Sequence, residues 1–275
     1  MNEKGWALVF SVGKRYAKEG YFDGAMYDAN SLFASVEKKL TNRNSINFTV
    51  LYTPNSRGKN SPNTDEITAL TSTKYNSYWG FQNGKQRNSR IKTVEEPVIM
   101  LNDYFKINAV TQLNLGVLYQ FGKIGNSNLD YQNANSPTPS YYRKMPSYFS
   151  SLYAQDKGEF SGAFTPDLAN AELSKTQFLA QSQINWAALY QANQSPIVND
   201  YGKILGYEPA QSKYILYEDR TDDQNLAFNA LLNTELTENI RLNVGGSFNK
   251  VHSHNYQNVL DLLGRLYFED LDLFY

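Results

Sequence analysis

Regular alternation of apolar and polar residues is the feature that most constrains this chain. In the segment 240–249, apolar or small residues at even positions alternate with polar or small ones at odd positions: Ile240, Leu242, Val244, Gly246 and Phe248. Successive side chains of a β-strand point to opposite faces, so this segment predicts a strand with one apolar and one polar face. Six further segments show a similar period, near residues 6–16, 30–40, 46–52, 98–107, 113–121 and 214–235. The chain is therefore predicted to be all-β.

The lengths of the connections divide them into two groups. Polar turns of a few residues lie at 41–44, near Asn108 and at 237–239, whereas the stretches 54–96 and 122–213 are very long. Short turns at one end and long loops at the other are typical of an outer-membrane β-barrel. We expect an incomplete transmembrane antiparallel β-barrel of about seven up-and-down strands, with long extracellular loops that contain short helices. The helices are expected after Asn63 and around 183–191.

One face of these strands is predicted to meet lipid. Its residues should form a single belt roughly 25 Å tall, with these members: Leu32, Phe48, Leu115, Phe228 and Val244. Aromatic residues should mark its upper rim, at Tyr52, Tyr119, Phe121 and Phe248, and Trp6 its lower rim. The register of 98–107 is the least defined, because Asp103 shares parity with Leu101 and Phe105. The segment 214–235 exceeds the roughly 10 residues that cross a membrane, so its first half should stand above the bilayer.

Composition excludes several classes of function. The 26 basic and 27 acidic residues nearly cancel without long blocks of one sign, so no nucleic acid partner is predicted. Cysteine is absent, which removes disulfides and thiolate sites. The longest strongly apolar run, Trp6 to Phe10, is far shorter than the roughly 20 residues of a transmembrane helix.

The ends of the sequence suggest a piece of a larger protein. Residues 1–5 lead directly into a strand pattern without a signal peptide, and Leu271 to Tyr275, after a loop-like 258–264, show no closing strand. Seven strands do not close the usual even-numbered bacterial barrel. We therefore expect the chain to be a fragment at both ends.

Catalytic and metal sites receive little support. His252 and His254 would share one face of an extended segment, but two imidazoles are too few for a metal site, and we interpret them as polar loop residues. Asp222 and Asp223 would point to opposite faces of a strand, which does not suit paired acid–base chemistry. No enzyme activity and no cofactor are predicted.

Aromatic clusters in the long loops are the candidate ligand-binding residues: Tyr78, Trp79, Phe81, Tyr141 and Tyr142. If exposed, they could stack on a sugar or a cyclic ligand. Long ordered loops also use aromatic residues to pack on themselves, and we favour that interpretation. Ile184, Trp186, Leu189 and Tyr190 are expected to form an internal packing face.

The long loops also carry a family resemblance. The stretches 61–64, 75–90, 140–149, 184–186 and 189–193 resemble the barrel of TonB-dependent outer-membrane receptors, of the subgroup with an N-terminal carboxypeptidase-regulatory-like domain. One departure is Ser77, where the pattern would have proline after Asn76.

This resemblance implies that residues 1–275 are part of a 22-stranded barrel whose plug domain and closing strands are absent. The intact receptor would bind a scarce nutrient at the surface of a Gram-negative cell and import it across the outer membrane. Its expected partners are outer-membrane lipid, the TonB complex through the missing plug, an unknown nutrient and a surface lipoprotein. The ligand is left open among iron chelate, vitamin, peptide and glycan. The alternative is a surface adhesin or a carbohydrate-binding all-β module, in which the apolar faces of two sheets would interdigitate.

Overall fold

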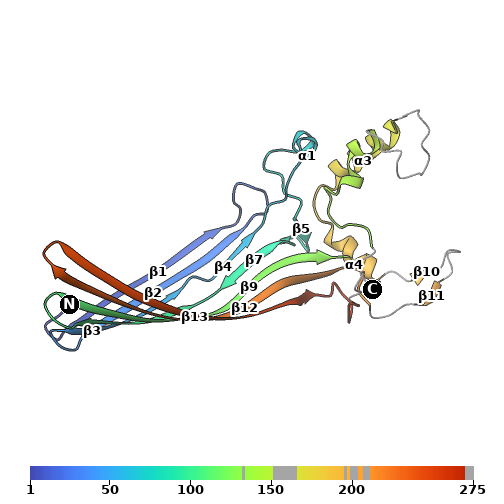
Figure 1. The fold of residues 1–275 in the computed structure, drawn as a ribbon. Helices are drawn as coiled ribbons and strands as arrows, with labels where there is room; N and C mark the ends of the chain where they lie inside the picture. Colours follow the sequence, from blue (N-terminus) through green and yellow to red (C-terminus); the bar gives the residue numbers. More distant parts are fainter. Residues whose placement is uncertain (132–133, 151–165, 195–196, 199–203, 207–210, 270–275) are drawn as a thin grey trace, which may run out of the picture.

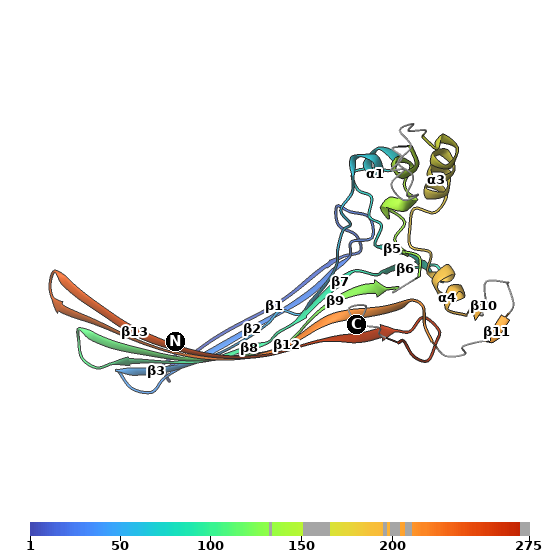
Figure 2. The ribbon, with the colours of Figure 1, turned by 45° about the vertical axis from the view of Figure 1, so that its right-hand side comes forward.

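Seven long strands form one curved antiparallel sheet in this computed structural model, which describes residues 1–131, 134–150, 166–194, 197–198, 204–206 and 211–269 (Figures 1 and 2). The order across the sheet follows the order in the chain. The strands are β1 (Trp6–Ala17), β2 (Tyr27–Lys39), β3 (Asn44–Tyr52), β8 (Val98–Lys106), β9 (Thr111–Asp130), β12 (Ile215–Thr237) and β13 (Ile240–Asp261). The prediction of an all-β, up-and-down architecture is confirmed.

Two short strands extend the sheet beyond prolines. β4 (Asn55–Gly58) continues β3 past Pro54, and β7 (Ile91–Glu95) precedes β8 across Pro97. Proline cannot donate to a ladder, but its carbonyl still accepts: Asn30 N–H donates to Pro54 O at 3.0 Å. The long connection predicted at 54–96 therefore begins and ends in strands that the sequence pattern did not indicate.

β9 and β13 are longer than predicted. β9 passes through Gly122, whose φ is +138°, and continues to Asp130. A Cβ at Gly122 would lie 2.0 Å from Glu95 O, so this glycine permits a close approach of two backbones rather than ending the strand. β13 runs to Asp261, so the predicted loop at 258–264 is wrong for its first four residues.

All three predicted tight turns lie at one end of the sheet, and the long connections lie at the other (Figure 1). At the first turn, the N–H groups of Leu40 and Thr41 donate to Asn44 O, and at the second, those of Ile107 and Asn108 donate to Thr111 O. The third turn joins β12 to β13. The asymmetry read from connection lengths is thus confirmed.

The loop end contains its own small elements. They are α1 (Asp65–Leu70), β5 (Trp79–Gln82), β6 (Lys85–Asn88), the 3₁₀ helix η1 (Tyr142–Lys144), α2 (Pro146–Ser150), α3 (Leu168–Ala180), α4 (Trp186–Gln194), β10 (Ile197–Val198) and β11 (Ile204–Gly206). The predicted helix after Asn63 is α1, where Thr64 Oγ1 accepts from Ile67 N–H at 3.3 Å. The predicted helix at 183–191 is α4, three residues later at each end. α3 was not predicted.

The buried apolar residues gather at the loop end. One cluster contains Leu129, Ile184, Trp186, Leu189, Tyr214, Leu216 and Leu263, and the second contains Ile67, Tyr75, Met145 and Phe178. Tyr75 OH also donates to Ser182 O at 2.6 Å, and burial raises the pKa of this phenol. The expected packing face of Ile184, Trp186 and Leu189 is confirmed. The large apolar residues of the sheet toward the tight turns remain exposed. The loop end and the turn end of the sheet therefore differ in how they are stabilised.

Candidate functional site

A row of apolar side chains crosses the whole sheet on one face, here called the outer face. Strand registers align these members: Leu8, Val36, Phe48, Leu101, Val117, Phe228 and Phe248. Leu8 is 74% exposed and Phe228 is 43% exposed, and no second sheet covers this row in the described residues. The predicted belt residues Leu32, Leu115 and Val244 share the same face by register. An apolar surface this extensive marks an interaction with lipid or with another protein.

The apolar band runs obliquely across the strands. It covers Trp6 to Val12 on β1 and Ile240 to Phe248 on β13, so its centre moves by about five residues over six strand-to-strand steps. At about 3.3 Å per residue and 4.8 Å per strand, the band slants by roughly 30° from the perpendicular to the strands. The eight residue steps from Ile240 to Phe248 span about 26 Å along β13, which the slant reduces to a height of about 23 Å. Both values are close to those of tilted strands crossing a membrane.

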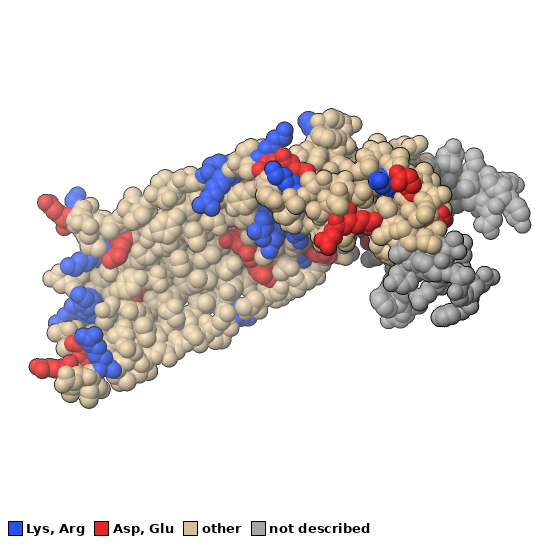
Figure 3. Space-filling model, turned by 90° about the horizontal axis from the view of Figure 1, so that it is seen from above, with Lys and Arg blue, Asp and Glu red and all other residues tan. Residues whose placement is uncertain are grey.

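Aromatic and charged residues mark the rims of the band. The rings of Tyr119 and Phe121 stack at 5.3 Å near its upper rim, and Lys38 Nζ lies 4.7 Å from the Trp6 ring near its lower rim. Asp103, the exception in the alternation, accepts a 2.5 Å hydrogen bond from Asn44 Nδ2 close to the turn end. On the face that Figure 3 shows, charged side chains gather at the two ends of the sheet, with a broad zone between them that carries almost none.

The opposite, inner face is polar and largely uncharged in its middle. Asn47 Nδ2 donates to Ser35 Oγ at 2.9 Å, and Thr49 Oγ1 donates to Asn47 Oδ1 at 2.8 Å. A Cβ on Gly116 would lie 2.7 Å from Asn229 Oδ1, so the amide fills the space beside this glycine. Linked hydroxyls and amides suit a hydrated surface better than a dry core.

The two histidines lie on the outer face of β13, so their interpretation as loop residues is wrong. His254 is opposite Asp222, and its ring lies 4.8 Å from the ring of Tyr256. Within the described residues, no group of three or more His, Cys, Asp or Glu side chains could hold a metal ion. The histidines line a hollow of about 680 Å³ together with Tyr52, Tyr119, Phe121, Lys123 and Asp222. This hollow lies at the upper rim of the apolar band.

The predicted aromatic residues of the β5–β6 hairpin are mostly used for packing. The Trp79 ring covers Gly24, where a Cβ would lie 2.2 Å from it, and it meets Phe81 edge to face at 5.3 Å. The guanidinium of Arg90 lies 5.2 Å from the Tyr78 ring. Phe81 alone of this group is strongly exposed, at 62%. The hairpin therefore presents one free aromatic surface.

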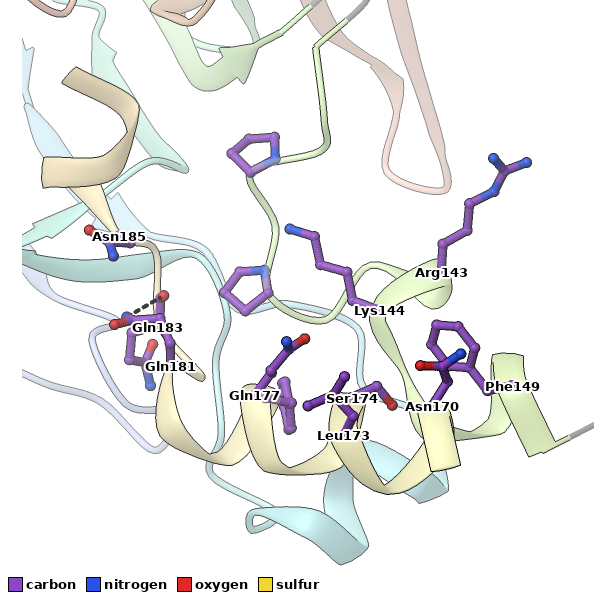
Figure 4. A pocket seen from close by; sticks show the side chains of 13 residues that line it. Arg143, Lys144, Phe149, Asn170, Leu173, Ser174, Gln177, Gln181, Gln183 and Asn185 are labelled. Atoms are coloured by element: carbon purple, nitrogen blue, oxygen red, sulfur yellow. Dashed lines mark hydrogen bonds between the residues drawn. The ribbon is translucent and has the colours of Figure 1, made fainter. Parts of the chain in front are cut away.

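Tyr141 and Tyr142 form a separate group with α2. Their rings lie 4.8 Å apart, and Tyr142 also meets Tyr148 at 5.8 Å. Tyr142 is 56% exposed. A neighbouring cavity of about 360 Å³ lies between α3 and the η1–α2 segment (Figure 4), where amide side chains such as Asn170 and Gln177 accompany Leu173 and Phe149. Neither the hairpin aromatics nor Tyr141 and Tyr142 line it, so sequence reasoning missed this cavity.

A charged cluster joins the hairpin, α4 and β13. Arg87 Nη2 lies 2.7 Å from Asp261 Oδ2, Tyr190 OH donates to the same oxygen at 2.9 Å, and the Arg87 guanidinium stacks on Trp186 at 4.2 Å. Burial of Asp261 opposes its ionisation. The hydrogen bonds from Arg87, Leu263 N–H and Tyr190 nevertheless hold the pKa of its carboxyl below the usual value. These partners are far apart in sequence, so no local pattern could have shown them.

No helix among the described residues is long and apolar enough to cross a membrane.

Comparison with known proteins gives one distant likeness. No family model matches the chain, and no curated protein matches it. Among solved structures, the chain is similar to the crystal structure of a Pseudomonas aeruginosa FadL homologue, at 11% identity and a TM-score of 0.34. The alignment covers 94% of this chain and 50% of that one, so the chain spans about half the length of the solved structure.

Proposed function

We propose that this chain forms part of the wall and the surface loops of an outer-membrane β-barrel that takes up a nutrient. The oblique apolar band is the observation that carries the proposal. The outer face of the sheet is exposed across all seven strands, and the band on it is about 23 Å tall. The inner face of the sheet is polar. A bilayer and a hydrated lumen account for both faces together.

Closing the barrel requires further strands beside β1 and β13. In the described residues each of these strands pairs on one side only. Each unpaired backbone group costs roughly 2–7 kcal/mol in hydrocarbon. In the proposed assembly, additional strands therefore pair with both edges.

The more specific proposal is a TonB-dependent receptor, which would draw energy from the inner membrane through a plug domain. Its support is the resemblance of the loop sequences around 75–90 and 140–149. The full protein should bind the isolated periplasmic domain of TonB. Failure to bind would remove TonB from the account while leaving the barrel in place.

The alternative of a soluble adhesin or carbohydrate-binding sandwich lacks a comparable observation. A sandwich would cover Phe48 and Phe228 with a second sheet, whereas both are exposed in the described structure.

Cell fractionation tests the proposal. The full protein, expressed in a Gram-negative host, should be found in the outer-membrane fraction, resist carbonate extraction and migrate differently in gels before and after boiling. Recovery in the soluble fraction, or release by carbonate, would contradict the proposed location.

A further inference from the structure

Four cationic side chains occupy neighbouring positions on the inner face near the loop end: Arg57, Lys59, Arg90 and Lys92. Arg57 and Lys92 are direct cross-strand partners of β4 and β7. The next pair is Lys59 and Arg90, joined by a 2.8 Å backbone hydrogen bond from Lys59 N–H to Arg90 O. Lys59 and Arg90 lie one residue beyond the ends of β4 and β7, and this hydrogen bond continues the β4–β7 pairing. Alternate residues of an extended pair share a face, and the charges of Arg57, Arg90 and Lys92 all act on Lys59, so the two pairs form a compact two-by-two array.

These cations lack acidic partners. None of the four forms an ion pair in the part of the chain that the structure describes, although seven other such pairs are present there. Burial lowers the pKa of Lys59, and the charges of Arg90, Lys92 and Arg57 lower it further. Like charges directly opposite each other destabilise a sheet. The array therefore weakens the folded sheet unless an anion neutralises it.

The surroundings of the array offer few compensating charges. Along the same register row, Lys92 is followed by Asn126 on β9 and then by Asp219 on β12. Asp219 is one strand further away, and it accepts a 3.3 Å hydrogen bond from Gln257. The row above contains the phenol of Tyr217, which accepts from Asn128 Nδ2 at 3.1 Å. Asp130 lies on the same face of β9, two residues beyond Asn128, and its charge and that of Arg90 both act on the Tyr217 phenol. Four cations thus face two carboxylates and several neutral hydrogen-bonding groups.

The spacing of the array indicates the kind of anion that fits. Neighbouring strands lie about 4.8 Å apart, and alternate residues of a strand lie about 6.6 Å apart. Two acidic groups separated by a few ångströms could each meet a pair of cations, and arginine suits planar or tetrahedral oxyanions. A single small anion would engage only part of the array.

We propose that Arg57, Lys59, Arg90 and Lys92 form a binding site for a small polyanion that carries two or more carboxylate or phosphate groups. This inference rests on the barrel proposed above, because that proposal assigns the inner face of the sheet to the lumen. In that barrel, the site lies at the outer mouth. It would there collect an anionic ligand before passage.

Titration calorimetry on the full protein folded in detergent tests the site, with pyrophosphate and citrate as probes and acetate as the comparison. The double variant Arg57→Gln, Lys92→Gln removes one cross-strand pair. The matched control is Arg43→Gln, Lys106→Gln, which removes an adjacent Arg–Lys pair at the turn end, where Lys106 N–H donates to Arg43 O. The variant Arg57→Lys, Arg90→Lys retains the charge.

We expect pyrophosphate or citrate to bind more tightly than acetate, and more weakly as salt is raised. The first double variant should lose about tenfold or more in affinity, while the control should bind within about twofold of the original. The charge-retaining variant should lose less affinity than the first double variant, because only the arginine geometry is removed. Without ligand, the variant Arg57→Gln, Lys92→Gln should be at least as stable as the original protein, because the repulsion between these two cations is removed. Binding of one probe alone would assign the site to carboxylates or to phosphates.

Two results would overturn the inference. One is the absence of binding by both probes, and the other is an equal loss in the control variant. Because binding is measured in detergent and the proposed location is measured by fractionation, failure of one can be told from failure of the other.

Discussion

Two buried asparagines join the loops to the sheet through backbone groups. Asn76 donates to the carbonyls of Asp23 and Lys59, and Asn193 donates to those of Tyr214, Leu262 and Leu263. Each side-chain oxygen also accepts two N–H groups. Because one side chain satisfies several buried backbone groups, we expect each of these asparagines to stabilise the loop end more than an exposed asparagine would.

Replacing Asn193 by alanine should loosen the loop end while leaving the sheet intact. An unsatisfied buried group costs about 1–3 kcal/mol, and the hydrogen bonds to the segment 262–263 would be lost together. We expect faster hydrogen exchange in α4 and near Tyr214, with unchanged exchange in β3. The control is Asn249→Ala, at an exposed position of β13. Equal effects of the two changes would show that Asn193 is not a structural junction.

Protonation of Asp261 at acid pH should release α4 from β13, because the Asp261 carboxylate holds Arg87 and accepts a hydrogen bond from Tyr190 of α4. Since the pKa of Asp261 is lower in the folded protein than the ordinary value of 3.8, its contribution to stability is present above that value. This contribution is lost as the pH falls through the lower, folded-state pKa. We expect an acid-induced change in Trp186 fluorescence, because Arg87 would leave its ring.

The variant Asp261→Asn should already show the detached signal at neutral pH and should lack this acid transition. An identical titration in both proteins would place the acid-sensitive group elsewhere.

At the scale of elements, strand alternation predicted the sheet well because one face must be consistently apolar. It failed where this requirement ends: above the apolar band, both faces of β9 and β13 carry polar residues, so their upper halves resembled loops. β4 and β7 were missed because the pairing of four-residue and five-residue segments depends on distant partners. The basic array was missed for the same reason, although Arg57 and Lys59, like Arg90 and Lys92, show the two-residue spacing of one strand face.

Gly122 should be the least replaceable glycine of β9. Alanine there would adopt a left-handed φ and meet Glu95 O at 2.0 Å, so we expect a loss of about 2 kcal/mol or more. The matched change Gly246→Ala adds a methyl group to open space. Urea unfolding in detergent should show a lower midpoint for the first variant only. Equal midpoints would mean that β7 and β9 can separate without cost.

At the scale of the whole molecule, the loop end and the turn end of the sheet distribute their apolar side chains differently. The loop end buries Trp186, Phe178 and their neighbours in conventional apolar clusters. The turn end exposes its apolar side chains and directs amides to the inner face. A membrane-spanning sheet with folded surface loops combines these two patterns, and the aromatic candidates Phe81 and Tyr142 are exposed on the loop portion.

The most direct test compares the two faces with spin labels on single cysteines, which the cysteine-free chain makes straightforward. Labels at Phe48, Val117 and Phe228 should be accessible to oxygen dissolved in lipid. Labels at the adjacent inner positions Asn47, Leu118 and Asn229 should be accessible to a water-soluble nickel reagent. The full protein in lipid vesicles should show this alternation on β3, β9 and β12. Equal access of the nickel reagent to both faces would contradict a membrane-spanning sheet.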